Sequence, residues 1–101
     1  MFVHQVYFWL KNPDSSEDYS QLLEGIKGLA YIEPKTLFHV GVPASTDRPV
    51  IDRSYTFSLL LGFSDQEEHD AYQQHPAHLK FVEECSALWS KVVIYDSVNP
   101  D

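Results

Sequence analysis

The sequence is short of cysteine, of basic side chains and of long apolar runs, and each shortage excludes a class of protein. Cys85 is the only cysteine in 101 residues, so no disulfide can form within the chain. It lies in a helical apolar pattern, with no histidine or other base beside it in the sequence. This setting favours a buried structural thiol over a nucleophile.

Basic residues are outnumbered by acidic ones, 7 against 15, which gives a net charge of −8 with histidine neutral. Binding to nucleic-acid phosphates requires lysine and arginine, so we expect no nucleic-acid partner. No apolar run reaches the ~18–20 residues of a membrane span, so we expect no membrane partner. The start, MFVHQVYFWLK, lacks the basic segment of a signal peptide, and the cytoplasm is the expected location.

Apolar side chains are abundant enough to build a core. Hydrophobic residues make up 44% of the chain and aromatic residues 14%, which excludes disorder. There is no repeat, low-complexity tract or linker. The sequence therefore predicts one domain over residues 1–101.

The first predicted strand, Phe2–Leu10, is apolar on both of its faces. Phe2, His4, Val6, Phe8 and Leu10 share one face, and Val3, Gln5, Tyr7 and Trp9 share the other. Two apolar faces indicate a strand that is covered on both sides. The alternation of even- and odd-numbered residues does not show which of the two faces meets the helices.

The remaining elements are predicted by periodicity and by their start and stop signals. A helix begins near Ser15 or Ser16 and ends by Tyr31, and a capping box at Ser64–Glu67 opens a short helix to about Gln74. The other elements are strands Lys35–Val42, Ser54–Phe63 and Lys91–Ser97, a helix from Pro76 to about Trp89, and a long loop, Pro43–Arg53.

This order, β-α-β-β-α(α)-β, predicts an α+β ferredoxin-like fold with a four-stranded antiparallel sheet. Helices cover only one face of such a sheet, and the apolar residues on the other face require a partner. We expect a homodimer with the two sheet faces packed together, which makes a dimeric α/β barrel.

Two histidines and a tyrosine lie close together in the segment YQQHPAHLKF, residues 72–81. Zinc sites need three or four ligands, and His75-x-x-His78 supplies two, so we expect no metal there. His75 precedes Pro76 and is expected at a helix junction, where an imidazole can satisfy free backbone groups.

An alternative role for this segment is acid/base chemistry. An imidazole titrates near neutral pH, and a neighbouring phenol can donate a hydrogen bond to a carbonyl or enolate oxygen. His78 and Tyr72 have the residue types for removing a proton next to a carbonyl. His4 lines the same cavity if the even-numbered face of the first strand meets the helices.

The motif Tyr72-x-x-His75-Pro76-Ala77-His78-x-x-Phe81, followed by Trp89-x-Lys91-x-x-Ile94-x-Asp96, resembles the stress-responsive A/B barrel domain (Dabb) family. The resemblance extends over nearly the whole chain, and the Y-x-x-HPAH segment is its most specific part. It implies a dimeric α+β barrel, with a pocket between each sheet and its own helices.

The resemblance also implies roles for individual residues. In a plant polyketide cyclase of this family, the histidine matching His78 is taken as the base, the tyrosine matching Tyr72 assists it, and the histidine matching His4 lines the pocket. Phe57 stands where that cyclase has a pocket histidine, so we expect a more apolar pocket here, with His75 and Phe81 also lining it.

Two functions remain open at this point. One is a cofactor-independent enzyme of the cyclase or lyase type, acting on a small hydrophobic carbonyl compound. The other is a non-catalytic module that binds a small molecule or responds to stress.

Overall fold

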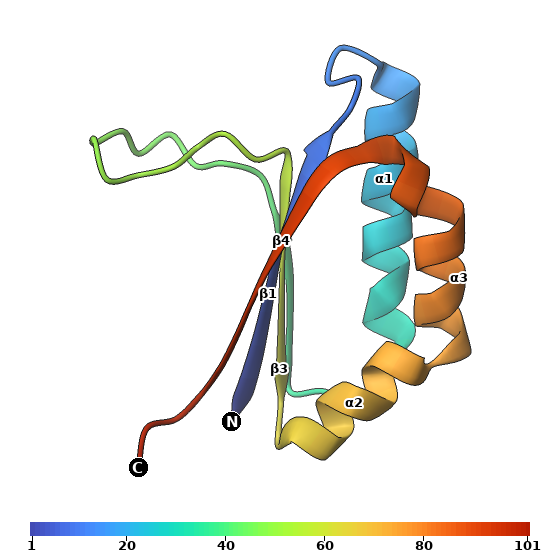
Figure 1. The fold of residues 1–101 in the computed structure, drawn as a ribbon, viewed down its shortest axis with the longest axis vertical. Helices are drawn as coiled ribbons and strands as arrows, with labels where there is room; N and C mark the ends of the chain where they lie inside the picture. The colour runs from blue at the N-terminus through green and yellow to red at the C-terminus, as the bar shows by residue number, and fades with distance from the viewer.

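A four-stranded antiparallel sheet, with helices on one of its faces, organises the chain (Figure 1). The computed structural model describes residues 1–101. Its elements are β1 (Phe2–Leu10), α1 (Ser16–Gly28), a 3-10 turn (Leu29–Tyr31), β2 (Leu37–Gly41), β3 (Phe57–Phe63), α2 (Gln66–Gln74), α3 (Pro76–Cys85), a second 3-10 turn (Ser86–Leu88) and β4 (Trp89–Val98).

The strand order across the sheet is β2-β3-β1-β4, and every neighbouring pair is antiparallel. The two strands that are central in space, β1 and β3, are separated in sequence by α1 and β2. This topology confirms the predicted α+β ferredoxin-like fold. The pairing of β1 with β4 places His4 opposite Asp96, at the far end of the chain.

The even-numbered face of β1 is the face that meets the helices. Its residues are all buried, whereas the odd-numbered ones are partly exposed. Fifteen buried apolar residues form the core between the sheet and the helices. Among them, Leu22 and Ile26 come from α1, and Leu59 and Leu61 from β3.

The helix starts follow from side chains that cap free backbone N–H groups. Ser15 accepts a hydrogen bond from the backbone N–H of Asp18 at the start of α1, as expected. The cap of α2 lies one residue later than predicted. Asp65, and not Ser64, accepts from the N–H of Glu68, and Glu68 Oε1 accepts from the N–H of Ser64 at 2.9 Å.

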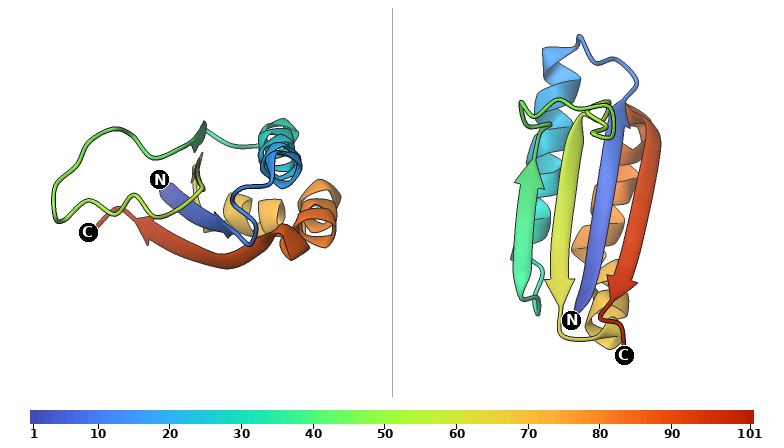
Figure 2. Two further views of the ribbon diagram at one scale, coloured as in Figure 1. Left: turned by 90° about the horizontal axis from the view of Figure 1, so that it is seen from above. Right: turned by 90° about the vertical axis from the view of Figure 1, so that its left-hand side faces the viewer.

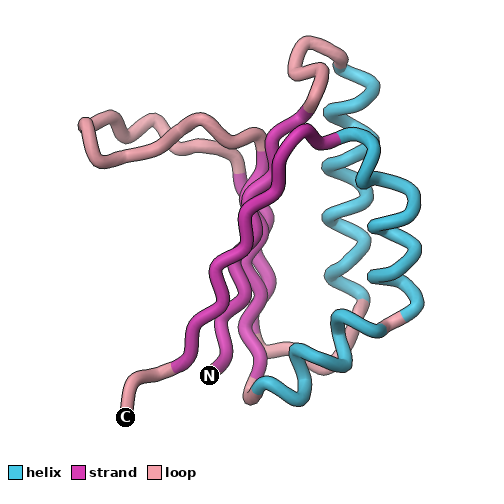
Figure 3. Tube along the Cα trace, viewed as in Figure 1, coloured by secondary structure: helices cyan, strands magenta, loops and turns pink.

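Four other elements have boundaries that differ from the predicted ones. The second and third strands are shorter, the third helix ends at Cys85, and β4 begins at Trp89 because that residue pairs with Leu10. The segment between β2 and β3, residues 42–56, is therefore longer than the predicted loop. It projects from the sheet on the side opposite the helices (Figures 1, 2 and 3).

The face of the sheet away from the helices carries aromatic side chains. The ring of Tyr7 lies 5.0 Å from that of Tyr55 and 6.2 Å from that of Tyr95. The ammonium group of Lys91 lies 4.6 Å from the ring centre of Trp9. No helix is both long and apolar enough to span a bilayer.

Candidate functional site

The junction of α2 and α3 brings Tyr72 and His78 together. Pro76 prevents His75 from being helical, and His75 has the extended backbone angles φ −63° and ψ 137°. Pro76 then occupies the first turn of α3, where its missing N–H leaves no bond unmade. This break turns the chain so that the two rings meet edge to face, with centroids 4.9 Å apart.

Tyr72 is almost completely buried on the core side of α2, with 2% of its surface exposed. Burial raises the pKa of its phenol well above the ordinary value, because the charged phenolate loses its hydration. The hydroxyl therefore keeps its proton at neutral pH. A protonated phenol can donate a hydrogen bond to an oxygen atom placed beside it.

His78 is partly buried in the first turn of α3. Burial lowers the pKa of its imidazole, and the nearby His4 lowers it further, while the Gln73 backbone carbonyl opposes the shift. Its Nδ1 atom is buried and has no hydrogen-bond partner in the protein. The ring is therefore neutral at pH 7 and can accept a proton.

His4 reaches the same region from β1. Its ring is 2% exposed, and its Nδ1 lies 2.5 Å from Oδ1 of Asp96 on the neighbouring strand β4. Burial lowers the pKa of His4, and the hydrogen bond with Asp96 opposes that shift. The other ring nitrogen, Nε2, lies 3.3 Å from the side-chain amide of Gln73.

These side chains border a cavity of about 190 Å³ between the sheet and α3. Its polar lining comes from His4, Tyr72, Gln73 and His78, and the rest is apolar. Val92 and Ile94 of the edge strand β4 also line it and are 38% and 51% exposed, so the cavity opens to solvent at this edge. An apolar cavity of about 150 Å³ holds benzene, so this cavity has room for a molecule with one ring.

The structure brings together four of the six predicted site residues: His4, Tyr72, His78 and Phe81 all line this cavity. The other two lie elsewhere, which corrects the expectation that they line the pocket. His75 is exposed, and its Nδ1 accepts a hydrogen bond from the N–H of Ala77 at 3.0 Å. Phe57 is fully buried beneath α1, where its ring packs 4.7 Å from that of Tyr19.

Sequence reasoning gave no role to three polar residues around His4. Asp96 is brought to His4 by the register of β1 and β4, which links positions 92 residues apart. His69 and Gln73 lie three residues before and one residue after Tyr72, on the same side of α2. Helical spacing relates His69 to Tyr72, three residues on, and to Gln73, four residues on, and is the one signal in the sequence for these two residues.

A larger hollow of about 360 Å³ lies on the open face of the sheet and is lined by Tyr7, Trp9, Asp52, Tyr55, Lys91, Val93 and Tyr95. No histidine lines it. Its titratable residues are partly or largely exposed, whereas the cavity beside His78 has the buried side chains of His4 and Tyr72 in its wall. We therefore assign the candidate site to the smaller cavity.

Several solved structures resemble the chain over almost its full length. A Dabb family protein with a ferredoxin-like fold from Mesorhizobium loti has 28% sequence identity and a TM-score of 0.80, covering 99% of this chain and 97% of that chain. A protein from Arabidopsis thaliana has 25% identity and a TM-score of 0.78, covering 100% and 97%. A hydroxynitrile lyase from Passiflora edulis has 19% identity and a TM-score of 0.77, covering 99% and 94%.

Dimeric ferredoxin-like proteins of unknown function share the same fold. They come from Thermobifida fusca, Bacteroides fragilis and a Jannaschia species, with identities of 17%, 18% and 20% and TM-scores of 0.76, 0.71 and 0.72. Comparison with curated proteins gives no match.

The family model described as "Stress Responsive A/B Barrel Domain" matches residues 2–99, which is nearly the whole chain. The fold, the paired helices and the YxxHPAH junction agree with this match. The chain therefore belongs to the stress-responsive A/B barrel domain family, Dabb.

Proposed function

We propose that the protein binds a small, neutral, hydrophobic carbonyl compound and transfers a proton at the carbon next to its carbonyl group. The observation that carries this proposal is the pairing of the Tyr72 and His78 rings, 4.9 Å apart, at the wall of an apolar cavity. His78 is the general base, Tyr72 polarises the carbonyl, and His4 orients the ligand.

The protonation states of the pair suit this chemistry. His78 is neutral at pH 7, since burial lowers its pKa, and it can take the proton from the α-carbon. Removing that proton moves negative charge to the carbonyl oxygen. The phenol of Tyr72 keeps its proton, and its O–H can donate to this oxygen in the enolate more strongly than in the ketone.

The size and lining of the cavity define the class of ligand. A volume of about 190 Å³ favours a single ring with a short substituent. No lysine or arginine lines the cavity, so a carboxylate or phosphate would be buried without a counter-charge. The hydroxynitrile lyase from Passiflora edulis shares the fold at 19% identity, so an enzyme can be built on this scaffold.

We also propose that two copies of the chain pair through the open face of the sheet. Tyr95 on this face is 62% exposed in the single chain, and Tyr7, Trp9 and Val93 surround it. A contiguous aromatic patch of this kind is typical of an interaction surface. Three solved proteins with the same fold are dimeric, which supports a homodimer.

The proposed reaction is tested with acetophenone in D2O as the probe. Binding is followed in amide NMR spectra, where shifts at Tyr72, Phe81 and Val82 place the ketone in the cavity and shifts at Tyr95 place it on the open face. Exchange of the methyl protons for deuterium reports proton removal. Binding in the cavity with no exchange above the buffer rate would favour the non-catalytic binding module and contradict the enzyme.

A further inference from the structure

His69 on α2 has a buried ring nitrogen, Nε2, with no hydrogen-bond partner in the protein. Its ring contacts the rings of Phe2 and Phe63, with centroid distances of 4.4 and 5.8 Å. Its Nδ1 lies 3.0 Å from a carboxylate oxygen of Asp70. A carboxylate can only accept, so in the neutral ring that donates to Asp70 the proton is on Nδ1 and Nε2 has a free lone pair.

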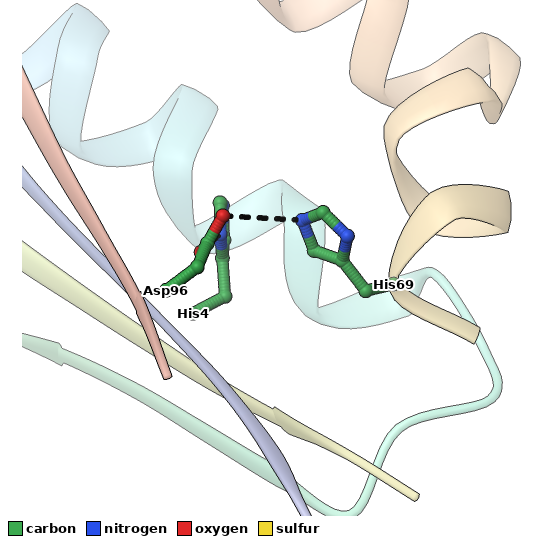
Figure 4. A group of neighbouring side chains, drawn as sticks. All are labelled: His4, His69 and Asp96. Carbon is green, nitrogen blue, oxygen red and sulfur yellow. Dashed lines mark hydrogen bonds and ion pairs between the residues drawn. The ribbon is translucent and has the colours of Figure 1, made fainter. Parts of the chain in front are cut away.

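That lone pair faces another acceptor. Nε2 of His69 is buried without a hydrogen-bond partner and lies 4.0 Å from Oδ2 of Asp96 (Figure 4). With the ring neutral and its proton on Nδ1, neither atom supplies a proton between them, so the buried Nε2 has lost its hydration without gaining a hydrogen bond. A cation between them would satisfy both.

His4 completes a set of three possible ligands. Its Nδ1 lies 2.5 Å from Oδ1 of Asp96, and one ligand atom each from His4, His69 and Asp96 lies within 4.8 Å of the others. β1, α2 and β4 supply one residue each, so the set forms only in the folded chain. We propose that these three residues bind one divalent transition-metal ion such as Zn²⁺.

The donor set and its dimensions suit such an ion. Zn²⁺ binds imidazole nitrogens and carboxylate oxygens at about 2.0–2.2 Å in a tetrahedral arrangement, so two ligand atoms of one ion lie roughly 3.3–3.6 Å apart. The ligand atoms here lie between 2.5 and 4.8 Å apart, so the side chains must adjust when the ion binds. Binding through Nδ1 of His4 requires the neutral tautomer with its proton on Nε2, so the proton on Nδ1 is lost as another is taken up at Nε2.

The surroundings also match a metal site. The Asp70 carboxylate orients His69 from its other nitrogen, and the Gln73 amide lies 3.3 Å from the free nitrogen of His4. Asp96 is 38% exposed, which gives the ion a path from solvent. Three protein ligands leave at least one coordination position open for water or another ligand.

This site shares His4 with the proposed reaction, but the proposed base, His78, and the proposed hydrogen-bond donor, Tyr72, are not ligands. The ion and the reaction can therefore fail separately. Binding of Zn²⁺ by a protein that does not exchange protons supports the ion alone.

The site is tested by calorimetric titration of the metal-free protein with Zn²⁺, and by the visible absorption of Co²⁺ as a substitute. We expect one ion per chain and the intense Co²⁺ absorption of a low coordination number. His69→Phe keeps an aromatic ring against Phe2 and Phe63 and removes the ligand. It should weaken binding by at least about 100-fold, because loss of a group that only orients a ligand already costs about 10–100-fold.

His75→Asn is the matched control, since it removes an exposed imidazole and keeps a capping side chain. It should bind Zn²⁺ as the wild-type protein does. A site that survives His69→Phe and disappears in His75→Asn would lie on the surface and overturn the proposal. The absence of any stoichiometric binding would overturn it as well.

A measurement on the wild-type chain decides the matter if His69→Phe does not fold. Imidazole ¹H–¹⁵N NMR spectra with one equivalent of Zn²⁺ should show metal-induced shifts of Nδ1 of His4 and Nε2 of His69. The ring nitrogens of His39 and His75 should keep their shifts. Shifts confined to the exposed histidines would contradict the site.

Discussion

The rings of Tyr72 and His78 meet at an angle of 62°, with their centroids 4.9 Å apart, although one residue belongs to α2 and the other to α3. The contact depends on the break at His75-Pro76, which sets the angle between the two short helices. The burial that keeps the phenol protonated also keeps the imidazole neutral. Local chain geometry thus prepares a proton donor and a proton acceptor at one cavity wall.

His75 supports this junction from outside the cavity, which predicts a loss of stability without a direct effect on the ligand. His75→Ala removes the acceptor for the Ala77 N–H and should lower the free energy of unfolding by about 0.5–2 kcal/mol, the usual effect of losing an N-cap. His75→Asn restores an acceptor and should recover most of the loss. Urea unfolding followed by circular dichroism measures both, and equal midpoints for the alanine variant and the wild type would show that the cap contributes nothing.

Two glycines of α1 should respond in opposite directions to alanine. A Cβ atom at Gly25 would lie 2.8 Å from Sγ of Cys85 and 3.2 Å from the Phe81 ring, whereas at Gly28 it would meet nothing within 4 Å. Gly25→Ala should therefore destabilise the protein by about 1–3 kcal/mol through overpacking. Gly28→Ala should stabilise it by up to about 1 kcal/mol, since alanine favours the helix.

Thermal unfolding of the two variants checks this pair. The wild-type melting temperature should lie between those of the two variants. Equal destabilisation by both substitutions would argue against close packing of α1 on α3 at Gly25.

Cys85 should be unreactive in the folded protein. It is 4% exposed, and burial, with a smaller contribution from Glu84, raises the pKa of its thiol. Alkylation by iodoacetamide at pH 8 should be at least about 1,000-fold slower than in urea, because global unfolding of a small domain costs about 5 kcal/mol or more. Labelling at the unfolded rate in native buffer would contradict the burial of this thiol.

The proposed dimer predicts that a charge on the open face separates the two chains. Tyr95→Glu places a carboxylate on the face that carries Tyr7 and Val93, where a partner would strip the charge of its hydration. Sedimentation equilibrium should show two chains per particle for the wild type and one for this variant. Tyr31→Glu is the control, because Tyr31 is 90% exposed in the turn after α1, and it should leave the wild-type mass unchanged.

Residues close together in sequence were the predictable part of the site. The spacing of Tyr72, Pro76 and His78 predicted a helix junction, and the period of two along β1 placed His4 on one face with Val6 and Phe8. The pairing of His4 with Asp96 depends on the register of β1 and β4, which no local pattern encodes. For the same reason the sequence did not show that His69 reaches this pair from α2.

The two misplaced pocket residues have separate physical causes. Phe57 faces the helices, as its place in the alternation of residues along β3 requires. Tyr19 of α1 packs against it and closes off that part of the sheet. His75 lies at the helix junction and satisfies a backbone N–H, as its place before Pro76 predicts, but it does not line the cavity as also expected. The extended backbone that Pro76 demands turns the His75 side chain back to cap α3, away from the cavity.

Proton exchange on acetophenone in D2O, compared between wild type and His78→Ala, tests the central claim most directly. A positioned general base contributes roughly 10²–10⁴ to the rate of proton transfer, so His78→Ala should lower the exchange rate by about that factor. His75→Asn should keep the wild-type rate. An exchange rate in folded His78→Ala equal to that of the wild type would contradict the assignment of His78 as the base.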